Sequence, residues 1–136
     1  MEIKNKVIVI TGGAGGIGLA IAKSLLMEEP KVIILADISF DDFDFKNNKV
    51  INKKCNVSKQ LDLNNLINEV NKEFGLIDIF FSNAGILSLG DEQSSNEDWD
   101  KNWKLHVMSH IFAAQKLIPD MLKRGSGYFV NTASAA

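Results

Sequence analysis

The sequence is short of several residue types that mark particular classes of protein. Among its 136 residues there is one cysteine, Cys55, so no disulfide can form within the chain, which fits a reducing compartment. The net charge of −2 provides no basic surface for nucleic acid or for an anionic membrane. No apolar run approaches the length of a membrane span, and the N-terminal residues carry no signal-peptide cleavage pattern. These absences favour a cytoplasmic protein.

The residues that are present favour one globular domain with alternating strands and helices. Hydrophobic residues make up 46% and charged residues 24% of the chain. Short apolar runs are typical of strands buried on both faces, and their alternation with helical patterns indicates a parallel sheet with right-handed crossovers. We expect Cys55 to be a packing residue of one strand. The predicted strands are Lys6–Thr11, Val32–Ala36, Val50–Cys55, Ile77–Phe81 and Gly127–Thr132; the predicted helices end near Glu28, Phe74 and Arg124, and Ile38–Asn48 is predicted to be a loop.

Several polar residues predict where the helices begin and end. Ser58 is placed to cap the second helix, and Gly75 to stop it. Ser95 and Asp98 form a predicted capping pair for a long helix that starts near Glu97. Because Pro119 lies inside that helix, we expect a bend or a local break there.

The long helix is apolar beyond a single face, which is typical of a helix that packs on two sides. The pattern leaves two interpretations open: a deeply buried helix, or a helix whose outer face forms a subunit interface. The main apolar stripe consists of Trp99, Trp103, Val107, Ile111, Ala114 and Ile118.

The glycine-rich segment Thr11–Gly18 follows the first predicted strand and opens the first helix. Glycines permit close approach of a ligand, and a helix N-terminus attracts anions, so the segment predicts a pyrophosphate site. Its glycines fit three spacings used by different nucleotide-binding proteins. They read as G-x-G-x-x-G from Gly13, as T-G-x-x-G-x-x-G through Gly15, and as T-G-x-x-x-G-x-G through Gly16.

Asp37 is the second element of the predicted nucleotide site. It ends the second predicted strand 19 positions after Gly18, close to the roughly 20 expected for a carboxylate that binds the ribose hydroxyls. The same carboxylate would repel the 2′-phosphate of NADP. No Arg or Lys lies in Gly12–Gly18 or directly after Asp37 to hold that phosphate. The sequence therefore predicts NAD as the cofactor rather than NADP.

Taken together, four segments resemble the short-chain dehydrogenase/reductase family. They are T-G-G-A-G-G-I-G at Thr11–Gly18, S-N-A-G at Ser82–Gly85, the helix W-D-K-N-W-K-L-H-V-M at Trp99–Met108, and G-Y-F-V-N-T-A-S-A-A at Gly127–Ala136. The resemblance implies a Rossmann-type, doubly wound parallel sheet of the α/β class. It also implies that residues 1–136 are a single, incomplete NAD-binding domain with about five strands, from which the family's C-terminal strands and helices are missing.

The resemblance also selects among the glycine spacings, because the N-A-G motif accompanies the spacing through Gly12, Gly16 and Gly18. In the family, the Asn of N-A-G helps to hold the sheet, and the next two residues let the backbone lie close to the cofactor. The family often has Asp-Val near the adenine where this chain has Asn56 and Val57. The implied cofactor-binding residues are Thr11, Gly12, Gly16, Ile17, Gly18, Asp37, Asn56, Val57, Asn83, Ala84 and Gly85.

For the chemistry, the resemblance implies hydride transfer between an alcohol or ketone and nicotinamide. Ser134 would hydrogen-bond the substrate oxygen. His106 stands where the family places an Asn that holds a water of the proton relay, and it is either a relay residue or a packing residue. The family's Tyr and Lys, spaced Y-x-x-x-K, do not occur among the 136 residues, and Tyr128 is interpreted as a strand residue.

We therefore expect an NAD-dependent oxidoreductase that acts on a small-molecule alcohol or carbonyl compound, represented here by a truncated form. The alternative is a catalytically inactive nucleotide-binding or scaffold protein. The resemblance implies a dimer or tetramer through helix 97–124 in the full-length protein. For this chain, we expect an exposed edge at the fifth strand, with aggregation or self-association as its consequence.

Overall fold

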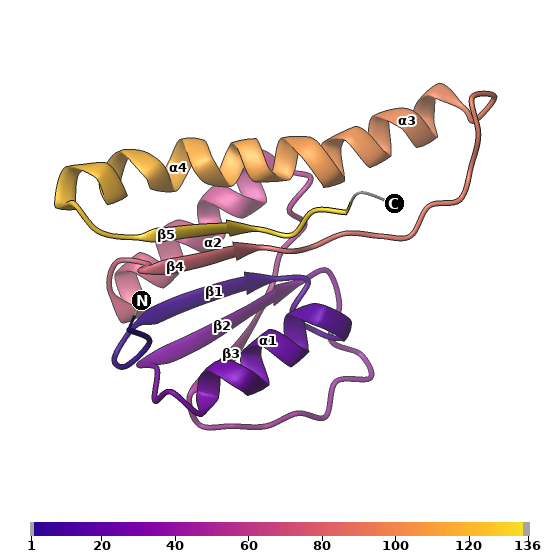
Figure 1. The fold of residues 1–136 in the computed structure, drawn as a ribbon. Helices are drawn as coiled ribbons and strands as arrows, with labels where there is room; N and C mark the ends of the chain where they lie inside the picture. Colours follow the sequence, from indigo (N-terminus) through magenta and orange to yellow (C-terminus); the bar gives the residue numbers. More distant parts are fainter. Residues whose placement is uncertain (1, 135–136) are drawn as a thin grey trace.

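A computed structural model describes residues 2–134, in which five parallel strands form one sheet with the order β3-β2-β1-β4-β5 (Figure 1). The chain winds outward from β1 to one edge through β2 and β3, and then to the other edge through β4 and β5. This confirms the predicted doubly wound α/β fold. The strands are β1 (Val7–Thr11), β2 (Val32–Asp37), β3 (Val50–Lys54), β4 (Ile79–Ser82) and β5 (Tyr128–Asn131).

Helices cover the two faces of the sheet, as Figure 1 shows. Helix α1 (Gly16–Leu26) packs on one face, against apolar side chains of β1 and β2. Helix α2 (Gln60–Phe74) and helix α4 (Ser109–Arg124) pack on the other face. No helix in the described part of the chain is long and apolar enough to cross a membrane.

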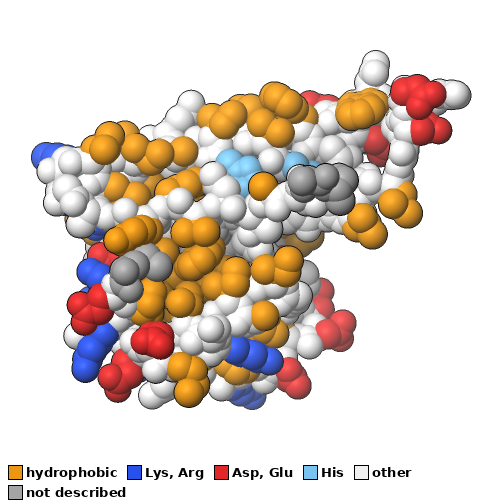
Figure 2. Space-filling view, in the orientation of Figure 1, with side chains coloured by type: hydrophobic (Ala, Val, Ile, Leu, Met, Phe, Trp, Pro, Cys, Tyr) orange, Lys and Arg blue, Asp and Glu red, His pale blue; other side chains and the backbone are white. Residues whose placement is uncertain are grey.

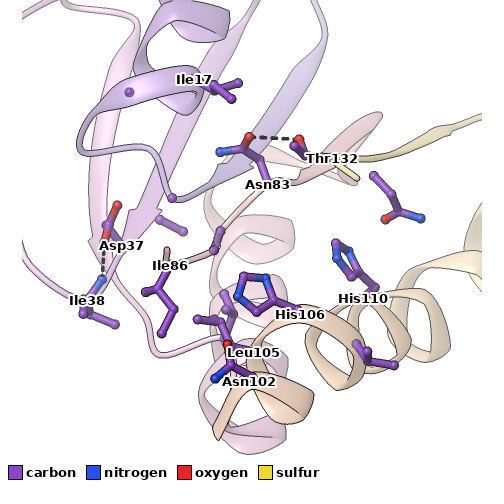
Figure 3. Close-up of a pocket in the computed structure, with 18 of the residues that line it drawn as sticks. Ile17, Asp37, Ile38, Asn83, Ile86, Asn102, Leu105, His106, His110 and Thr132 are labelled. Atoms are coloured by element: carbon purple, nitrogen blue, oxygen red, sulfur yellow. Dashed lines mark hydrogen bonds between the residues drawn. The ribbon is translucent and has the colours of Figure 1, made fainter. Parts of the chain in front are cut away.

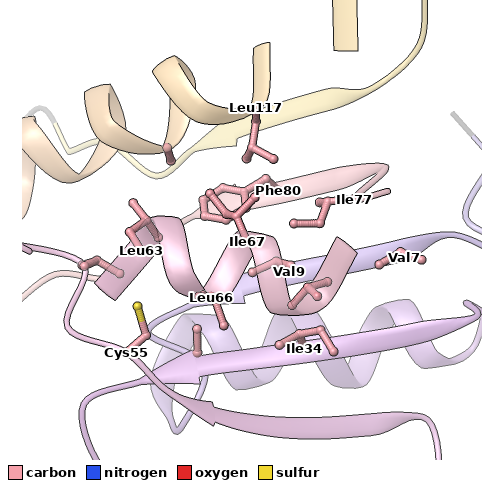
Figure 4. Packing of buried hydrophobic residues seen from close by; sticks show 14 of the residues in the cluster. Val7, Val9, Ile34, Cys55, Leu63, Leu66, Ile67, Ile77, Phe80 and Leu117 are labelled. Carbon is pink, nitrogen blue, oxygen red and sulfur yellow. The ribbon is translucent and has the colours of Figure 1, made fainter. Parts of the chain in front are cut away.

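Hydrophobic cores on both faces of the sheet explain why the central strands are continuous apolar runs. All five residues of β1 are buried, because helices cover both of its faces. Figure 4 shows Val9 and Ile34 of the sheet packed beneath Leu66 of α2, with Cys55 at the margin of the same cluster. Cys55 is 5% exposed, which confirms the predicted packing position.

The loop Ile38–Asn48 contains neither helix nor strand, as predicted. Its aromatic rings pack edge to face, with 5.3 Å between the centroids of Phe40 and Phe43 and 6.3 Å between those of Phe43 and Phe45. The ammonium of Lys23 in α1 lies 5.1 Å from the Phe45 ring centroid. The ring contacts lie within the loop, and the Lys23–Phe45 contact joins the loop to α1.

Two of the predicted helix boundaries are confirmed and one is wrong. Ser95 accepts a hydrogen bond from the Asp98 amide at 3.1 Å, and Gly75 ends α2 with a φ of 100°. Ser58 does not cap α2. Its amide and hydroxyl both donate to the Asn56 carboxamide oxygen, so its hydroxyl is used within the preceding turn, and Lys59 takes the N-cap position without a side-chain bond.

The long helix is continuous, and its π-helical segment does not lie at the proline. Helix α3 (Asn96–Trp103) runs into a π-helical segment, η1 (Lys104–Met108), and then into α4. The predicted break at Pro119 is absent, since α4 continues through that residue. The wider turns occur instead at η1, and such π-segments are frequent at functional sites.

The apolar stripe of the long helix lies largely outside the core, so the interpretation as a deeply buried helix is wrong. Helix α4 buries Ser109, Ala113, Leu117 and Met121, and α3 buries no residue. The side chains of Trp99 and Trp103 remain 56% and 57% exposed. We call the exposed residues Trp99, Trp103, Ile111, Ile118 and Leu122 the outer stripe.

Candidate functional site

A cleft of about 1350 Å³ opens at the carboxyl ends of β1, β2 and β4 (Figure 3). In open α/β sheets, ligands bind where the strand order changes direction, which here is between β1 and β4. The cleft brings together most of the residues predicted from the sequence. Those that line it are Gly12, Gly16, Ile17, Asp37, Asn56, Val57, Asn83, Ala84, Gly85, His106 and Ser134.

The glycine loop contains residues with different steric requirements. Gly12 has a φ of +67°, and a Cβ there would lie 2.9 Å from Ala84 Cα. A Cβ on Gly18 would lie 2.1 Å from the Gly12 carbonyl oxygen. Gly16 has a φ of +49° beside open space, whereas Gly15 is extended and its Cβ would meet nothing. The backbone thus favours the spacing through Gly12, Gly16 and Gly18, since the other two spacings require Gly15.

The first turn of α1 has the features of an anion site. Helix α1 begins at Gly16, so its unpaired backbone N–H groups and positive dipole end point into the cleft. That turn contains no acidic residue to compete with an anion. Ile17 lies beside it with a 62% exposed side chain. Thr11 and Gly18 lie beneath this surface and do not line the cleft.

Asp37 has a structural contact that the sequence did not reveal. One carboxylate oxygen accepts the Ala14 N–H at 3.0 Å, and the other accepts the Ile38 N–H at 2.8 Å. The carboxylate therefore ties the glycine loop to the end of β2. Each oxygen keeps a further lone pair for a ligand hydroxyl. No Lys or Arg lines the cleft among residues 2–134, so no cation is placed to pair with a second phosphate.

A hydrogen-bond network joins the ends of β1, β4 and β5. The Thr11 hydroxyl donates to the Phe81 carbonyl and accepts the N–H groups of Asn83 and Ala84 at 2.9 and 3.0 Å. The Asn83 side chain donates to the Thr11 carbonyl at 3.0 Å and accepts the Thr132 hydroxyl at 2.9 Å. Sequence reasoning missed Thr132, whose hydroxyl links the segment before Ser134 to the floor of the cleft.

Two histidines of the long helix line the cleft. His106 lies in η1, and a Cβ on Gly85 would come within 3.0 Å of its Cε1 atom. His110 lines the same cleft from the first turn of α4. Sequence reasoning singled out His106 alone, although the four-residue spacing was a signal that both rings share one helix face. Ser134 lines the cleft at the end of the described chain, and Ala135 and Ala136 lie outside the described residues.

Three features together define a dinucleotide-binding protein of the Rossmann type. They are the order of the parallel strands, the glycine turn at the N-terminus of α1, and the carboxylate at the end of β2. Comparison with known families agrees with this class. The model of the short chain dehydrogenase family matches residues 6–136, and the chain belongs to that family. The family resemblance drawn from the sequence is thereby confirmed.

Curated relatives include two bacterial dehydrogenases. The chain is 31% identical to an NAD-dependent glycerol dehydrogenase of Listeria innocua over 99% of its own length and 55% of the relative's length. It is 30% identical to a meso-2,3-butanediol dehydrogenase of Serratia marcescens, with coverage of 100% and 56%. The chain thus spans about half the length of the curated relatives it matches.

Solved structures that resemble this chain are also short-chain dehydrogenases. A short-chain dehydrogenase/reductase of Burkholderia phymatum in complex with NAD superposes with a TM-score of 0.89 at 29% identity, over 98% of this chain and 50% of that one. A short-chain dehydrogenase structure from Novosphingobium aromaticivorans gives a TM-score of 0.87 at 27% identity, over 98% and 53%.

Proposed function

We propose that the chain is the N-terminal, cofactor-binding portion of an NAD-dependent oxidoreductase that acts on a small-molecule alcohol or carbonyl compound. One observation carries this proposal: the glycine loop and Asp37 line the same cleft. A 3.0 Å hydrogen bond from the Ala14 N–H to the Asp37 carboxylate joins them. The name of the Listeria relative and the NAD complex of the Burkholderia structure support the choice of cofactor.

The residues of the cleft fit a dinucleotide in a definite order. The N–H groups of the first turn of α1 would hold the pyrophosphate, with Gly12 and Gly16 leaving room for it. Asp37 would accept hydrogen bonds from both adenosine ribose hydroxyls, and its charge would disfavour a 2′-phosphate. Asn56 and Val57 line the cleft beyond Asp37 and would contact the adenine. When bound, NAD supplies the hydride chemistry.

At the other end of the cleft, the described residues would orient a substrate. The Ser134 hydroxyl would hydrogen-bond the substrate oxygen, and the Thr132–Asn83 bond would hold the preceding strand end in place. His106 would take the position of the relay Asn. A Tyr and Lys in the Y-x-x-x-K spacing, which would supply the acid and base, do not occur in the 136 residues. For this chain alone we therefore propose weak NAD binding and no turnover.

The second candidate is a catalytically inactive nucleotide-binding or scaffold protein. His106 in place of the family Asn favours it. The coding sequence directly downstream of Ala136 discriminates between the two candidates. A Y-x-x-x-K there supports the oxidoreductase, and a genuine stop codon supports the inactive protein.

Cofactor binding is tested by calorimetry with NAD and NADP on the wild-type chain and on Asp37→Asn. Asn keeps one oxygen, which can accept the Ala14 N–H, but it removes the negative charge and one of the two acceptors. We expect wild type to prefer NAD, and Asp37→Asn to lower the ratio of NAD to NADP affinity at least tenfold. Asp41→Asn, in the exposed loop, is the matched control and should leave the ratio unchanged. Equal affinities in wild type would contradict the proposal.

A further inference from the structure

The two histidines of the cleft form a pair that the cofactor site does not account for. His106 and His110 are the only histidines of the sequence, and they lie four residues apart on one continuous helix. Figure 3 shows both rings projecting from the same side of the helix, toward the strand ends that carry Asn83 and Thr132. Both side chains line the cleft.

Neither imidazole has a hydrogen-bond or ion-pair partner among residues 2–134. The Nδ1 atom of His110 is covered from solvent and has no partner there. Buried polar atoms without a partner are rare in native proteins and call for an explanation. The His106 ring lies beside Gly85, where an added Cβ would come within 3.0 Å of its Cε1 atom. A ligand could therefore bind either ring without breaking an existing hydrogen bond of that ring.

In the described part of the cleft, no positively charged side chain competes with a cation at the pair. Among the described residues that line the cleft there is no Lys or Arg, and Asp37 is the one acidic residue. Neutral imidazole is a preferred ligand of Zn²⁺, Ni²⁺ and Co²⁺, and two histidines at positions i and i+4 of one helix face have the spacing of helical zinc motifs. Cys55 also lines the cleft, but burial raises its pKa to about 12, so it remains a thiol at neutral pH.

We propose that His106 and His110 together bind one divalent transition-metal ion of the Zn²⁺, Ni²⁺ or Co²⁺ class. Residues 2–134 contain no cluster of three or more His, Cys, Asp or Glu side chains that could hold a metal, so water and neutral oxygens of the cleft complete the coordination. The ion is consequently exchangeable. Its affinity depends on both rings, because the second ligand acts at a high effective concentration once the first is bound.

The test is metal titration of the full chain, freed of any polyhistidine tag, at pH 7.5. Isothermal calorimetry with Zn²⁺ and visible absorption with Co²⁺ should both give one ion per chain. His106→Gln and His110→Gln, which keep polar side chains of similar length, should each weaken binding at least tenfold. The double variant should abolish it.

Two controls make the result decisive. Gln115→Ala changes a polar side chain on the same helix and should leave metal affinity unchanged, as should Cys55→Ala. Far-UV circular dichroism of each variant shows whether the helix is retained. The proposal is overturned if the folded wild-type chain binds none of the three ions at millimolar concentration, or if either single histidine variant binds as tightly as wild type.

Discussion

At the scale of single residues, the first turn of α1 separates glycines that the chain requires from one that it does not. A Cβ on Gly18 would lie 2.1 Å from the Gly12 carbonyl oxygen, a backbone atom that cannot rotate away. A Cβ on Gly15 would meet nothing, and its backbone is extended. The two positions lie three residues apart and give a matched pair of substitutions.

We predict that Gly18→Ala lowers the free energy of unfolding by about 1–3 kcal/mol, because overpacking forces the backbone of the glycine loop to shift. Gly15→Ala should cost less, about 0.5–1 kcal/mol, because Gly15 is the N-cap of α1 and alanine caps a helix less well than glycine. Urea unfolding followed by circular dichroism measures both. Equal destabilisation by the two substitutions would show that the loop does not have the described conformation.

Cys55 makes stability depend on pH in the alkaline range. Burial, and then the negative charge of Asp62, raise its pKa from 9.0 to about 12. Between these values the unfolded chain has lost the thiol proton while the native chain keeps it. The unfolded state then binds fewer protons, so the free energy of unfolding falls as pH rises from 9 to 12, by up to about 1.4 kcal/mol per pH unit.

We predict that Cys55→Ala removes this slope. The alanine variant should be less stable than wild type at pH 8, because a buried side chain is shortened. The difference between the two proteins should shrink as pH rises above 9, since only wild type loses stability through the thiol. Urea midpoints at pH 8 to 11 measure the difference. A constant difference across that range would show that the thiol ionises as readily in the native state as in the unfolded one.

For single residues, the sequence predicted which side chains belong to the site better than it predicted the contacts that those side chains make. The position of Asp37 could be predicted, because strand length and the distance from Gly18 follow from local patterns. Its bond to the Ala14 amide could not, since that contact depends on how the loop after β1 folds over the end of β2. Thr132 was missed for the same reason: its partner, Asn83, is 49 residues away.

At the scale of elements, α3 depends on its cap more than on packing. No residue of α3 is buried, while Ser95 both accepts the Asp98 N–H and donates to the Asp98 carboxylate at 2.7 Å. The helix therefore has little tertiary support beyond its junction with η1. Its first turn should respond locally to loss of the cap.

We predict that Ser95→Ala weakens the first turn of α3 by about 0.5–2 kcal/mol, whereas Ser95→Gly costs only a few tenths. Hydrogen exchange of the Asp98 and Trp99 amides should speed up in the alanine variant. Exchange in the strands should be unaffected, because α3 does not contribute to the core. Unchanged exchange at Asp98 would mean that the cap does not hold the turn.

Element boundaries were predictable where one residue decides them, and not where neighbours compete. Gly75 ends α2 because its backbone adopts a positive φ that disfavours other residues. Ser58 does not cap α2, because its hydroxyl donates to the Asn56 carboxamide oxygen instead. Pro119 failed as a breaker because one missing N–H does not outweigh the packing of Leu117 and Met121 on the sheet.

At the scale of the whole molecule, apolar side chains stay exposed on two surfaces. Orange side chains lie along the long helix and beside the outer strand in Figure 2. The outer stripe includes Leu122, which is 75% exposed. On the α1 side of β5, Tyr128 and Val130 are also exposed, as expected for an edge strand. Patches of this kind mark interaction surfaces or aggregation hazards.

We propose that the outer stripe is the surface through which two copies associate, as the family resemblance implies. Trp103→Glu combined with Leu122→Glu should weaken self-association at least tenfold, because each places a charge in an apolar contact. Sedimentation velocity at several concentrations measures it. Lys101→Glu, on the same helix but outside the stripe, is the control. A monomeric wild-type chain would contradict the proposal.

The strand order β3-β2-β1-β4-β5 also has a consequence for synthesis of the chain. In chain order, each strand takes an outer edge of the sheet formed by the strands before it, so no strand has to insert between two that are already paired. The floor of the cleft, from Gly12 to Gly85, precedes both histidines in the chain. We expect nascent chains released after β4 to collapse around β1 already, since N-terminal segments fold first during translation.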